Sequence, residues 1–176
     1  MGCRTLALTA ALLVGCAAVA FAQGWFITVS GSGYTAPDSV GTGYMVSLGA
    51  GYRFNPYLAV LAGVGWAQYT IEVETEDGDT ENRDVYEIPI SAGVRVDLVP
   101  DAAVDPFVEA GPEAYLTKVE DEDWTNTWGA YAKGGVRFRI GSVGAIELWV
   151  RYSLADFEDT EQYRLTYGLG GSFSGR

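Results

Sequence analysis

Acidic side chains gather in three short polar segments of this chain. Carboxylate oxygens are the ligands that hard divalent cations prefer, so these segments are candidate cation-binding surfaces. The alternative is a set of solvated loops whose like charges resist self-association. Asp77, Gly78 and Asp79 do not follow the ordered ligand spacing of a calcium loop, so we expect no specific metal site. The acids concerned are Glu74, Glu76, Asp77, Asp79, Glu81, Glu120, Asp121, Glu122, Asp123, Asp156, Glu158, Asp159 and Glu161.

A second set of charged residues carries both signs and alternates with apolar residues. Its members are Arg53, Glu87, Arg95, Asp97, Glu109, Glu113, Lys133, Arg137, Arg139, Glu147, Arg151 and Arg164. Because an unpaired charge in a dry interior costs several kcal/mol, this pattern predicts a buried network of ion pairs. Glu109 and Glu113 share one strand face, but four residues along a strand span ~13 Å. That separation is too large for two carboxylates to share a proton, so ion pairing is favoured over acid–base catalysis.

Composition excludes several kinds of chemistry. The 176 residues include no His, 11 Lys+Arg and 23 Asp+Glu, for a formal net charge of −12. Without His there is no Ser-His-Asp hydrolysis and no His-ligated zinc. Without a basic cluster there is no nucleic-acid interface, because phosphate neutralisation needs Lys and Arg. We therefore expect neither an enzyme nor a cofactor.

The first 22 residues have the three parts of a secretory signal. Arg4 is followed by an apolar run and by Ala20-Phe21-Ala22, a small-x-small cleavage site. An alternative is lipoprotein processing at Leu13-Val14-Gly15-Cys16, with acylation of Cys16. Because Ala17 to Ala22 continue the apolar run, we favour the plain signal peptide. We expect a signal peptide over 1–22 and one domain over 23–176.

From residue 24 onward, apolar residues recur with a period of two, which is typical of strands. Eight strands are expected at 24–33, 43–54, 57–73, 85–98, 106–119, 127–140, 145–156 and 163–174. The connections alternate between short (55–56, 100–105, 141–144) and long (34–42, 74–84, 120–126, 157–162). This alternation predicts an all-β, eight-stranded antiparallel up-and-down barrel. Pro89 and Pro112 each remove a ladder donor, so we expect a bulge or local widening at both.

The alternation fits two kinds of barrel. A soluble barrel would bury the apolar face, whereas a transmembrane barrel would turn it outward. The polar face is rich in Gly and carries both signs of charge, which suits a narrow lumen. Aromatic residues such as Trp66 and Trp128 lie near strand ends on the apolar face, as in the girdles at the two membrane interfaces. These features favour the transmembrane barrel.

Two segments carry a family resemblance. The last expected strand, from Tyr163 to Phe173, looks like a C-terminal assembly signal, although Ser174-Gly175-Arg176 follow the aromatic residue that is usually terminal. Gly51-Tyr52-Arg53-Phe54-Asn55-Pro56-Tyr57 has the cadence of a strand entering a periplasmic turn. Over 24–176 the chain resembles the small eight-stranded outer-membrane β-barrels, which include the transmembrane domain of outer membrane protein A, its X-type relatives and opacity-like proteins.

The resemblance implies a location and partners. It implies export to the outer membrane of a Gram-negative cell envelope, with outer-membrane lipids and lipopolysaccharide as surroundings. It also implies that the outer-membrane insertion machinery reads the C-terminal strand. Enzymes of this group depend on a catalytic His, which this chain lacks.

We therefore expect a non-enzymatic barrel with a charged, plugged lumen and acidic extracellular loops. Its role would be structural or in surface interaction, and the residues indicate no particular loop partner. One alternative is a narrow cation-preferring pore. Another is a soluble periplasmic ligand-binding barrel.

Overall fold

The described chain folds into eight antiparallel strands. The structure is a computed structural model that describes residues 24–37, 39–74, 80–120, 122–157 and 162–174. The strands are β1 (Trp25–Thr35), β2 (Gly43–Arg53), β3 (Leu58–Glu74), β4 (Thr80–Asp97), β5 (Val104–Val119), β6 (Thr125–Ile140), β7 (Gly144–Leu154) and β8 (Tyr163–Ser174). The expected signal peptide lies outside these residues. Within the described ranges, no helix has the length and apolarity that a membrane crossing would need.

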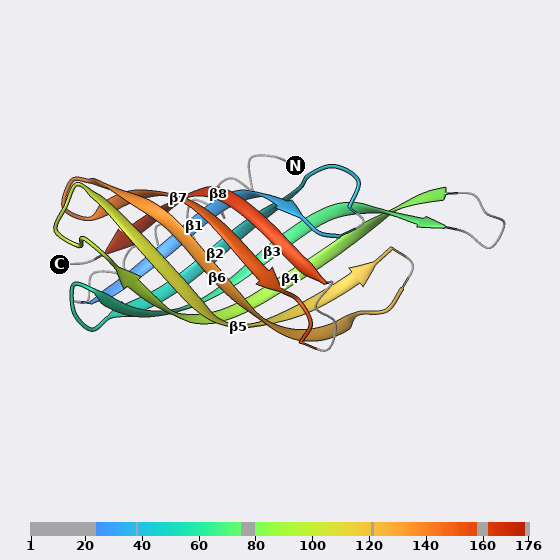
Figure 1. The fold of residues 1–176 in the computed structure, drawn as a ribbon, viewed down its shortest axis with the longest axis horizontal. Coiled ribbons are helices and arrows are strands. Elements are labelled where there is room, and N and C mark those ends of the chain that lie inside the picture. The colour runs from blue at the N-terminus through green and yellow to red at the C-terminus, as the bar shows by residue number, and fades with distance from the viewer. Residues whose placement is uncertain (1–23, 38, 75–79, 121, 158–161, 175–176) are drawn as a thin grey trace, which may run out of the picture.

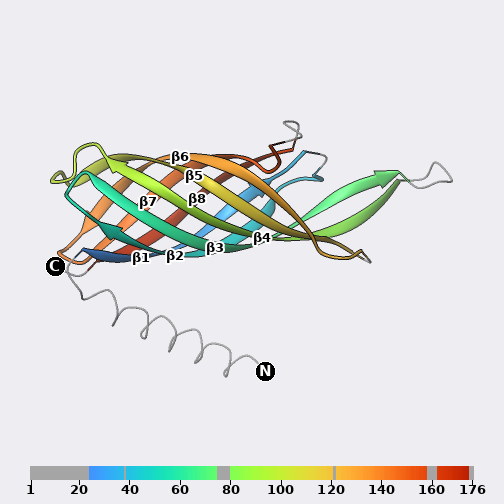
Figure 2. The same ribbon diagram turned by 90° about the horizontal axis from the view of Figure 1, so that it is seen from below.

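The sheet closes on itself. Each strand pairs with its sequence neighbours, and β8 returns to pair with β1 from Phe26–Ser174 to Thr35–Leu165 (Figure 1). The strands cross the long axis obliquely, as Figure 2 shows from a second direction. Closure removes the two free edges of the sheet along the barrel wall, where each strand has a neighbour on both sides. The predicted all-β, eight-stranded antiparallel barrel is confirmed.

The apolar face of every strand points outward. Trp128 is 63% exposed and Leu169 is 55% exposed, whereas Glu87 and Asp97 are fully buried. This distribution is the reverse of a soluble barrel, in which apolar residues fill the interior. A surface of this kind is stable against lipid and not against water. The interpretation as a soluble periplasmic ligand-binding barrel is therefore wrong.

The two ends of the barrel differ. Short turns at 54–57, 98–103 and 141–143 lie at one end, together with the start of β1 and the end of β8. The longer connections lie at the other end. In bacterial outer-membrane barrels the short turns face the periplasm and the long loops face the outside. We call these the periplasmic end and the outer end.

One hairpin extends further than the sequence predicted. The segment 74–84 was expected to be a loop, but β3 continues to Glu74 and β4 begins at Thr80, leaving 75–79 between them. Thr70 faces Asp84, and its hydroxyl donates a 3.0 Å hydrogen bond to that carboxylate. Figure 1 shows this hairpin projecting beyond the other strands. The strand propensity of Thr70, Ile71 and Val73, which face polar or charged residues of β4, outweighs the acidic composition that suggested a loop.

Pro89 and Pro112, the two prolines expected to cause bulges, interrupt pairing without shifting it. Between Val64–Ile90 and Ala67–Glu87, each strand advances by three residues, so Pro89 introduces no bulge. Rungs are missing where Pro112 lies, but the β4–β5 register is likewise the same on both sides. The lost amide donors thus leave gaps in the ladder rather than bulges.

Candidate functional site in the lumen

The charged face of the barrel lies inside, where it forms three layers along the axis. The outer layer, nearest the long loops, is built around Glu87 of β4. Arg164 of β8 approaches its two oxygens at 3.1 and 3.3 Å, and the Thr117 hydroxyl of β5 donates at 3.2 Å. The Tyr34 hydroxyl of β1 donates to the same carboxylate. One buried carboxylate therefore joins four strands around the barrel.

The middle layer holds two ion pairs among aromatic rings. Arg151 of β7 pairs with Glu113 of β5, whose carboxylate also accepts a 2.6 Å hydrogen bond from Tyr115. Lys133 of β6 lies 3.5 Å from Glu109 of β5.

Rings close the space around these charges. The Arg151 guanidinium lies 3.9 Å from the centre of the Tyr131 ring, and Lys133 lies 4.9 Å from that of Trp149. Such contacts between cations and ring faces are favourable, and more so where water is excluded. The cations of the middle layer thus lie between carboxylates and aromatic rings.

The inner layer, nearest the periplasmic end, is organised by Arg95. Its guanidinium makes two bonds to Glu147 of β7, of 3.1 and 2.8 Å, and one of 3.0 Å to Asp97. It also lies over the Phe107 ring, with its central carbon 3.7 Å from the ring centre. A planar guanidinium with five donors suits this simultaneous pairing and stacking.

Asp97 collects further cations in the inner layer. Arg53 approaches it at 2.7 Å and Arg137 at 3.3 Å, and Arg137 also pairs with Asp105. Among the described residues, one oxygen of Asp97 faces these cations without an aligned hydrogen bond. Part of the attraction between Asp97 and these two arginines is therefore Coulombic and does not depend on the alignment of a hydrogen bond.

Glycines make room for the large lumen side chains. A Cβ on Gly93 would collide with the Tyr131 hydroxyl and lie 2.9 Å from the Ala110 carbonyl oxygen. A Cβ on Gly135 would lie 2.8 Å from the Phe107 ring, the ring that stacks on Arg95. Real Cβ atoms do not approach this closely, so these side-chain positions require glycine at both places.

The structure brings together eleven of the twelve residues proposed for the lumen network. Those in ion pairs are Arg53, Glu87, Arg95, Asp97, Glu109, Glu113, Lys133, Arg137, Glu147, Arg151 and Arg164. Arg139 differs, because it is exposed at the periplasmic mouth and forms no ion pair within the described residues.

Sequence reasoning missed Asp105, which it had assigned to a turn. Asp105 lies in β5, is fully buried, and accepts a 3.0 Å hydrogen bond from the Val99 amide besides pairing with Arg137. The signal was its alternation with Glu109 and Glu113 on the same face. The aromatic side of the site, including Tyr34 and Tyr131, was also missed, because period-two alternation does not distinguish a lumen tyrosine from a loop-proximal one.

The acidic segments lie at the outer end as far as the structure describes them. Glu74 and Glu81 belong to strands β3 and β4, which corrects their assignment to a loop. Glu120, Glu122 and Asp123 are exposed, and Arg83 lies 3.4 Å from Glu81 and 3.7 Å from Glu122. Asp156, which follows β7, begins the third acidic segment. Glu76, Asp77, Asp79, Asp121, Glu158, Asp159 and Glu161 lie outside the described residues. Among the residues described, no group of three potential ligands could hold a metal ion.

Comparison with known proteins shows which family has this architecture. A family model described as the outer membrane protein beta-barrel domain matches residues 7–173. A search of curated proteins finds no match to the chain.

Several solved structures share the fold. Neisserial surface protein A matches with a TM-score of 0.66 at 16% identity, covering 86% of this chain and 97% of that one. OprG from Pseudomonas aeruginosa gives 0.62 at 13% identity, covering 86% and 97%. Ail, the attachment invasion locus protein of Yersinia pestis, gives 0.57 at 17% identity, covering 86% and 99%. With the family match over almost the whole chain and the outward apolar face, the chain belongs to the outer membrane protein beta-barrel domain family and is a protein of the outer membrane.

Proposed function

We propose that this protein is a non-enzymatic structural barrel of the outer membrane, with a lumen closed by ion pairs and an acidic outer surface. The observation that carries the proposal is the pairing across the lumen. Arg164 of β8 reaches Glu87 of β4 on the opposite side of the ring, and Arg95 of β4 reaches Glu147 of β7. These pairs tie distant strands together rather than lining an open path.

Closure of the lumen argues against steady conduction. An eight-stranded barrel is only just wide enough for its own side chains to fill it. Opening a path would separate pairs such as Arg151–Glu113, and each uncompensated buried charge costs several kcal/mol. Open states would therefore be rare, which favours the structural role over a narrow cation pore.

The pairing also supports the absence of catalysis. The lumen carboxylates among the described residues each lie within 4.0 Å of an Arg or Lys nitrogen. A general acid or base needs access to a substrate, and a buried carboxylate held by a cation lacks that access.

The surface role rests on the charge of the outer end. Exposed Glu120, Glu122 and Asp123 lie beside the acid-rich β3–β4 hairpin, with Arg83 among them. Such a surface attracts divalent cations through its summed field. We propose that these cations bridge it to the phosphates of lipopolysaccharide, without a dedicated metal site.

The C-terminal strand supports recognition by the outer-membrane insertion machinery. Tyr163, Leu165, Tyr167, Leu169 and Phe173 all face outward and are exposed. Insertion machinery that binds this strand before the barrel closes would contact these apolar and aromatic side chains.

Single-channel recording in planar bilayers tests the closed lumen. We expect no steady conductance from the wild type. A double variant, Glu87→Ala with Arg164→Ala, removes only the outer layer and should also stay silent, because the ion pairs of the middle and inner layers remain. A heat-dependent gel shift of protein reconstituted into vesicles of the same lipid shows that it inserts. A steady wild-type conductance that falls when Glu120→Gln, Glu122→Gln and Asp123→Asn are combined would replace this proposal with the cation pore.

The surface role has its own test. The wild type should bind lipopolysaccharide vesicles in magnesium, and a chelator should abolish the binding. The same triple loop variant should bind less, while Asp101→Asn, which neutralises an exposed acid on a periplasmic turn, should bind as the wild type does. Equal binding of both variants would contradict the role of the outer surface.

A further inference from the structure

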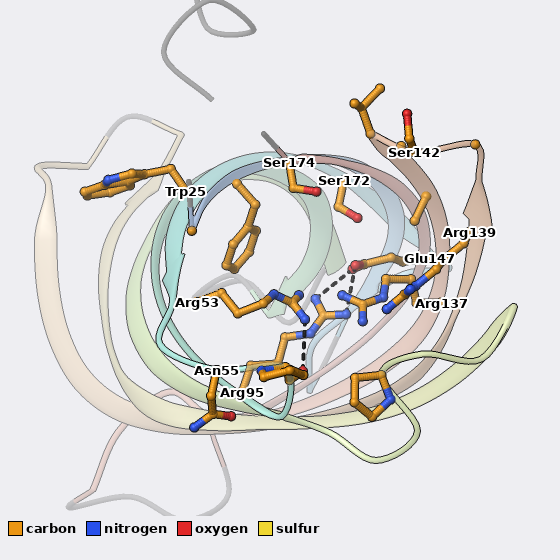
Figure 3. A pocket seen from close by; sticks show the side chains of 18 residues that line it. Trp25, Arg53, Asn55, Arg95, Arg137, Arg139, Ser142, Glu147, Ser172 and Ser174 are labelled. Carbon is orange, nitrogen blue, oxygen red and sulfur yellow. Dashed lines mark hydrogen bonds and ion pairs between the residues drawn. The ribbon is translucent and has the colours of Figure 1, made fainter. Parts of the chain in front are cut away.

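A cavity opens at the periplasmic end of the barrel, and its lining is basic. Its volume is 440 Å³, and its charged side chains are Arg53, Arg95, Arg137 and Arg139, with Glu147 as the acid (Figure 3). Figure 3 shows Arg53, Arg95 and Glu147 pointing toward the middle of the barrel from different strands. A lining of four cations and one anion is unexpected in a chain whose net charge is −12.

The counter-charges of the inner layer lie behind this lining. Asp97 and Asp105 are fully buried and do not line the cavity, although they pair with Arg53, Arg95 and Arg137. Together with Glu147 they balance these three arginines. Arg139 adds a charge that no carboxylate among the described residues balances. The cavity therefore presents guanidinium groups to its interior and carries a net positive charge.

Hydrogen-bond donors at the cavity are also left over. Asn55 uses its carbonyl oxygen to accept from the Tyr57 and Leu58 amides, at 2.9 and 3.0 Å, so its amide nitrogen keeps its donors. Ser142 and Ser172 add hydroxyls to the lining. These donors line the cavity and can bind an acceptor that enters it.

We propose that this cavity is an oxyanion site that takes a phosphate group. A guanidinium fork matches phosphate oxygens in geometry, and charge-assisted hydrogen bonds to it are about twice as strong as neutral ones. Arg139 supplies the uncompensated charge, and Arg53, which pairs with Asp97 and donates to the Pro56 carbonyl oxygen, also lines the cavity. The inference does not depend on whether the lumen conducts.

Two sources of phosphate reach this end of the barrel. One is a free phosphate in the periplasm. The other is the headgroup of an inner-leaflet phospholipid, because the exposed Trp25 and Val143 on the cavity rim place the mouth beside the membrane interface. Both present the same oxyanion.

The first test is a calorimetric titration of inorganic phosphate into the folded full chain in a non-ionic detergent. We expect saturable binding that Arg139→Gln weakens about tenfold, since it removes one charge-assisted contact. Arg139 is exposed and outside the ion pairs, so this variant should fold normally. The matched control is Arg83→Gln, which removes an equal charge at the outer end and should bind as the wild type does.

The second test separates the sources and uses nanodiscs. If phosphatidylglycerol in the disc suppresses phosphate binding and phosphatidylcholine does not, the occupant is a lipid headgroup. If phosphate binds equally in both, the occupant is a soluble phosphate. No saturable binding in detergent up to tens of millimolar phosphate, or an equal loss for Arg139→Gln and Arg83→Gln, would overturn the site.

Discussion

Arg164 and Glu87 lie 77 residues apart in the chain and face one another across the lumen, joining β8 to β4 through two hydrogen bonds of 3.1 and 3.3 Å. The two strands are half a turn apart in the ring of eight, so this contact spans the barrel rather than a neighbouring pair. Tyr34 and Thr117 complete the coordination of the carboxylate from β1 and β5. A charge pair of this kind ties four strands to one point.

The first prediction concerns that point. Arg164→Ala should lower the free energy of unfolding by ~3–5 kcal/mol, because it leaves the Glu87 carboxylate buried without its cation. Denaturant titration in detergent, followed by tryptophan fluorescence, measures the loss. Arg83→Ala removes an exposed ion pair and should cost at most ~1 kcal/mol. Equal losses for the two variants would contradict the lumen network.

Replacing both partners should differ from replacing one. Glu87→Leu combined with Arg164→Leu removes both charges and fills similar volume, so the double variant should be more stable than Arg164→Ala alone. The same denaturant titration compares them. A double variant less stable than the single one would contradict this expectation. It would show that losing the hydrogen bonds from Tyr34 and Thr117 to the carboxylate costs more free energy of unfolding than leaving the carboxylate without its cation.

A second prediction compares two arginines of one strand. Arg137→Ala should destabilise the barrel by ~3–5 kcal/mol, because Asp105 loses its partner and one cation of Asp97 is lost. Arg139→Ala, two residues further along β6, should change stability by less than ~0.5 kcal/mol because its side chain is exposed. If both variants resist denaturant as the wild type does, the inner layer does not stabilise the barrel.

A third prediction concerns the glycines of the lumen. Gly93→Ala should destabilise the barrel, since the added Cβ meets the Tyr131 hydroxyl and the Ala110 carbonyl oxygen. Overpacking of this kind typically costs ~1–3 kcal/mol. Gly134→Ala faces open space and should be close to neutral. The temperature at which each variant unfolds in detergent measures the difference, and a neutral Gly93→Ala would show that the lumen is less tightly filled than the contacts indicate.

A fourth prediction follows from closure of the sheet. Unboiled protein from the membrane fraction should migrate differently from boiled protein on a detergent gel, because the β1–β8 ladder leaves no edge from which unfolding can start. Identical migration of the two samples, with the protein in the soluble fraction, would contradict the closed barrel in the membrane.

Much of this architecture follows from local pattern. Period-two alternation places Glu87, Arg95 and Asp97 on the face opposite Ile88 and Ile90, and it does so without knowledge of any partner strand. Turn residues such as Asn55 and Pro56 divide the alternating runs, so the number of strands and the two kinds of ends could also be read directly. The outward apolar face is stable in lipid and not in water, and the family match shows that the membrane is the outer one.

Which charged residues pair with one another across the lumen could not be predicted from this alternation. Whether Arg164 meets Glu87 or Glu113 depends on the stagger of the strands around the closed ring, which is a property of all eight pairings together. The same closure carries Asp105 inward against Arg137, leaves Arg139 at the mouth, and assembles four arginines around one cavity. Alternation decides on which face a side chain lies, because that depends on the residue and its neighbours in one strand. Its depth along the axis and its neighbours across the lumen depend on how far each strand slides against the next.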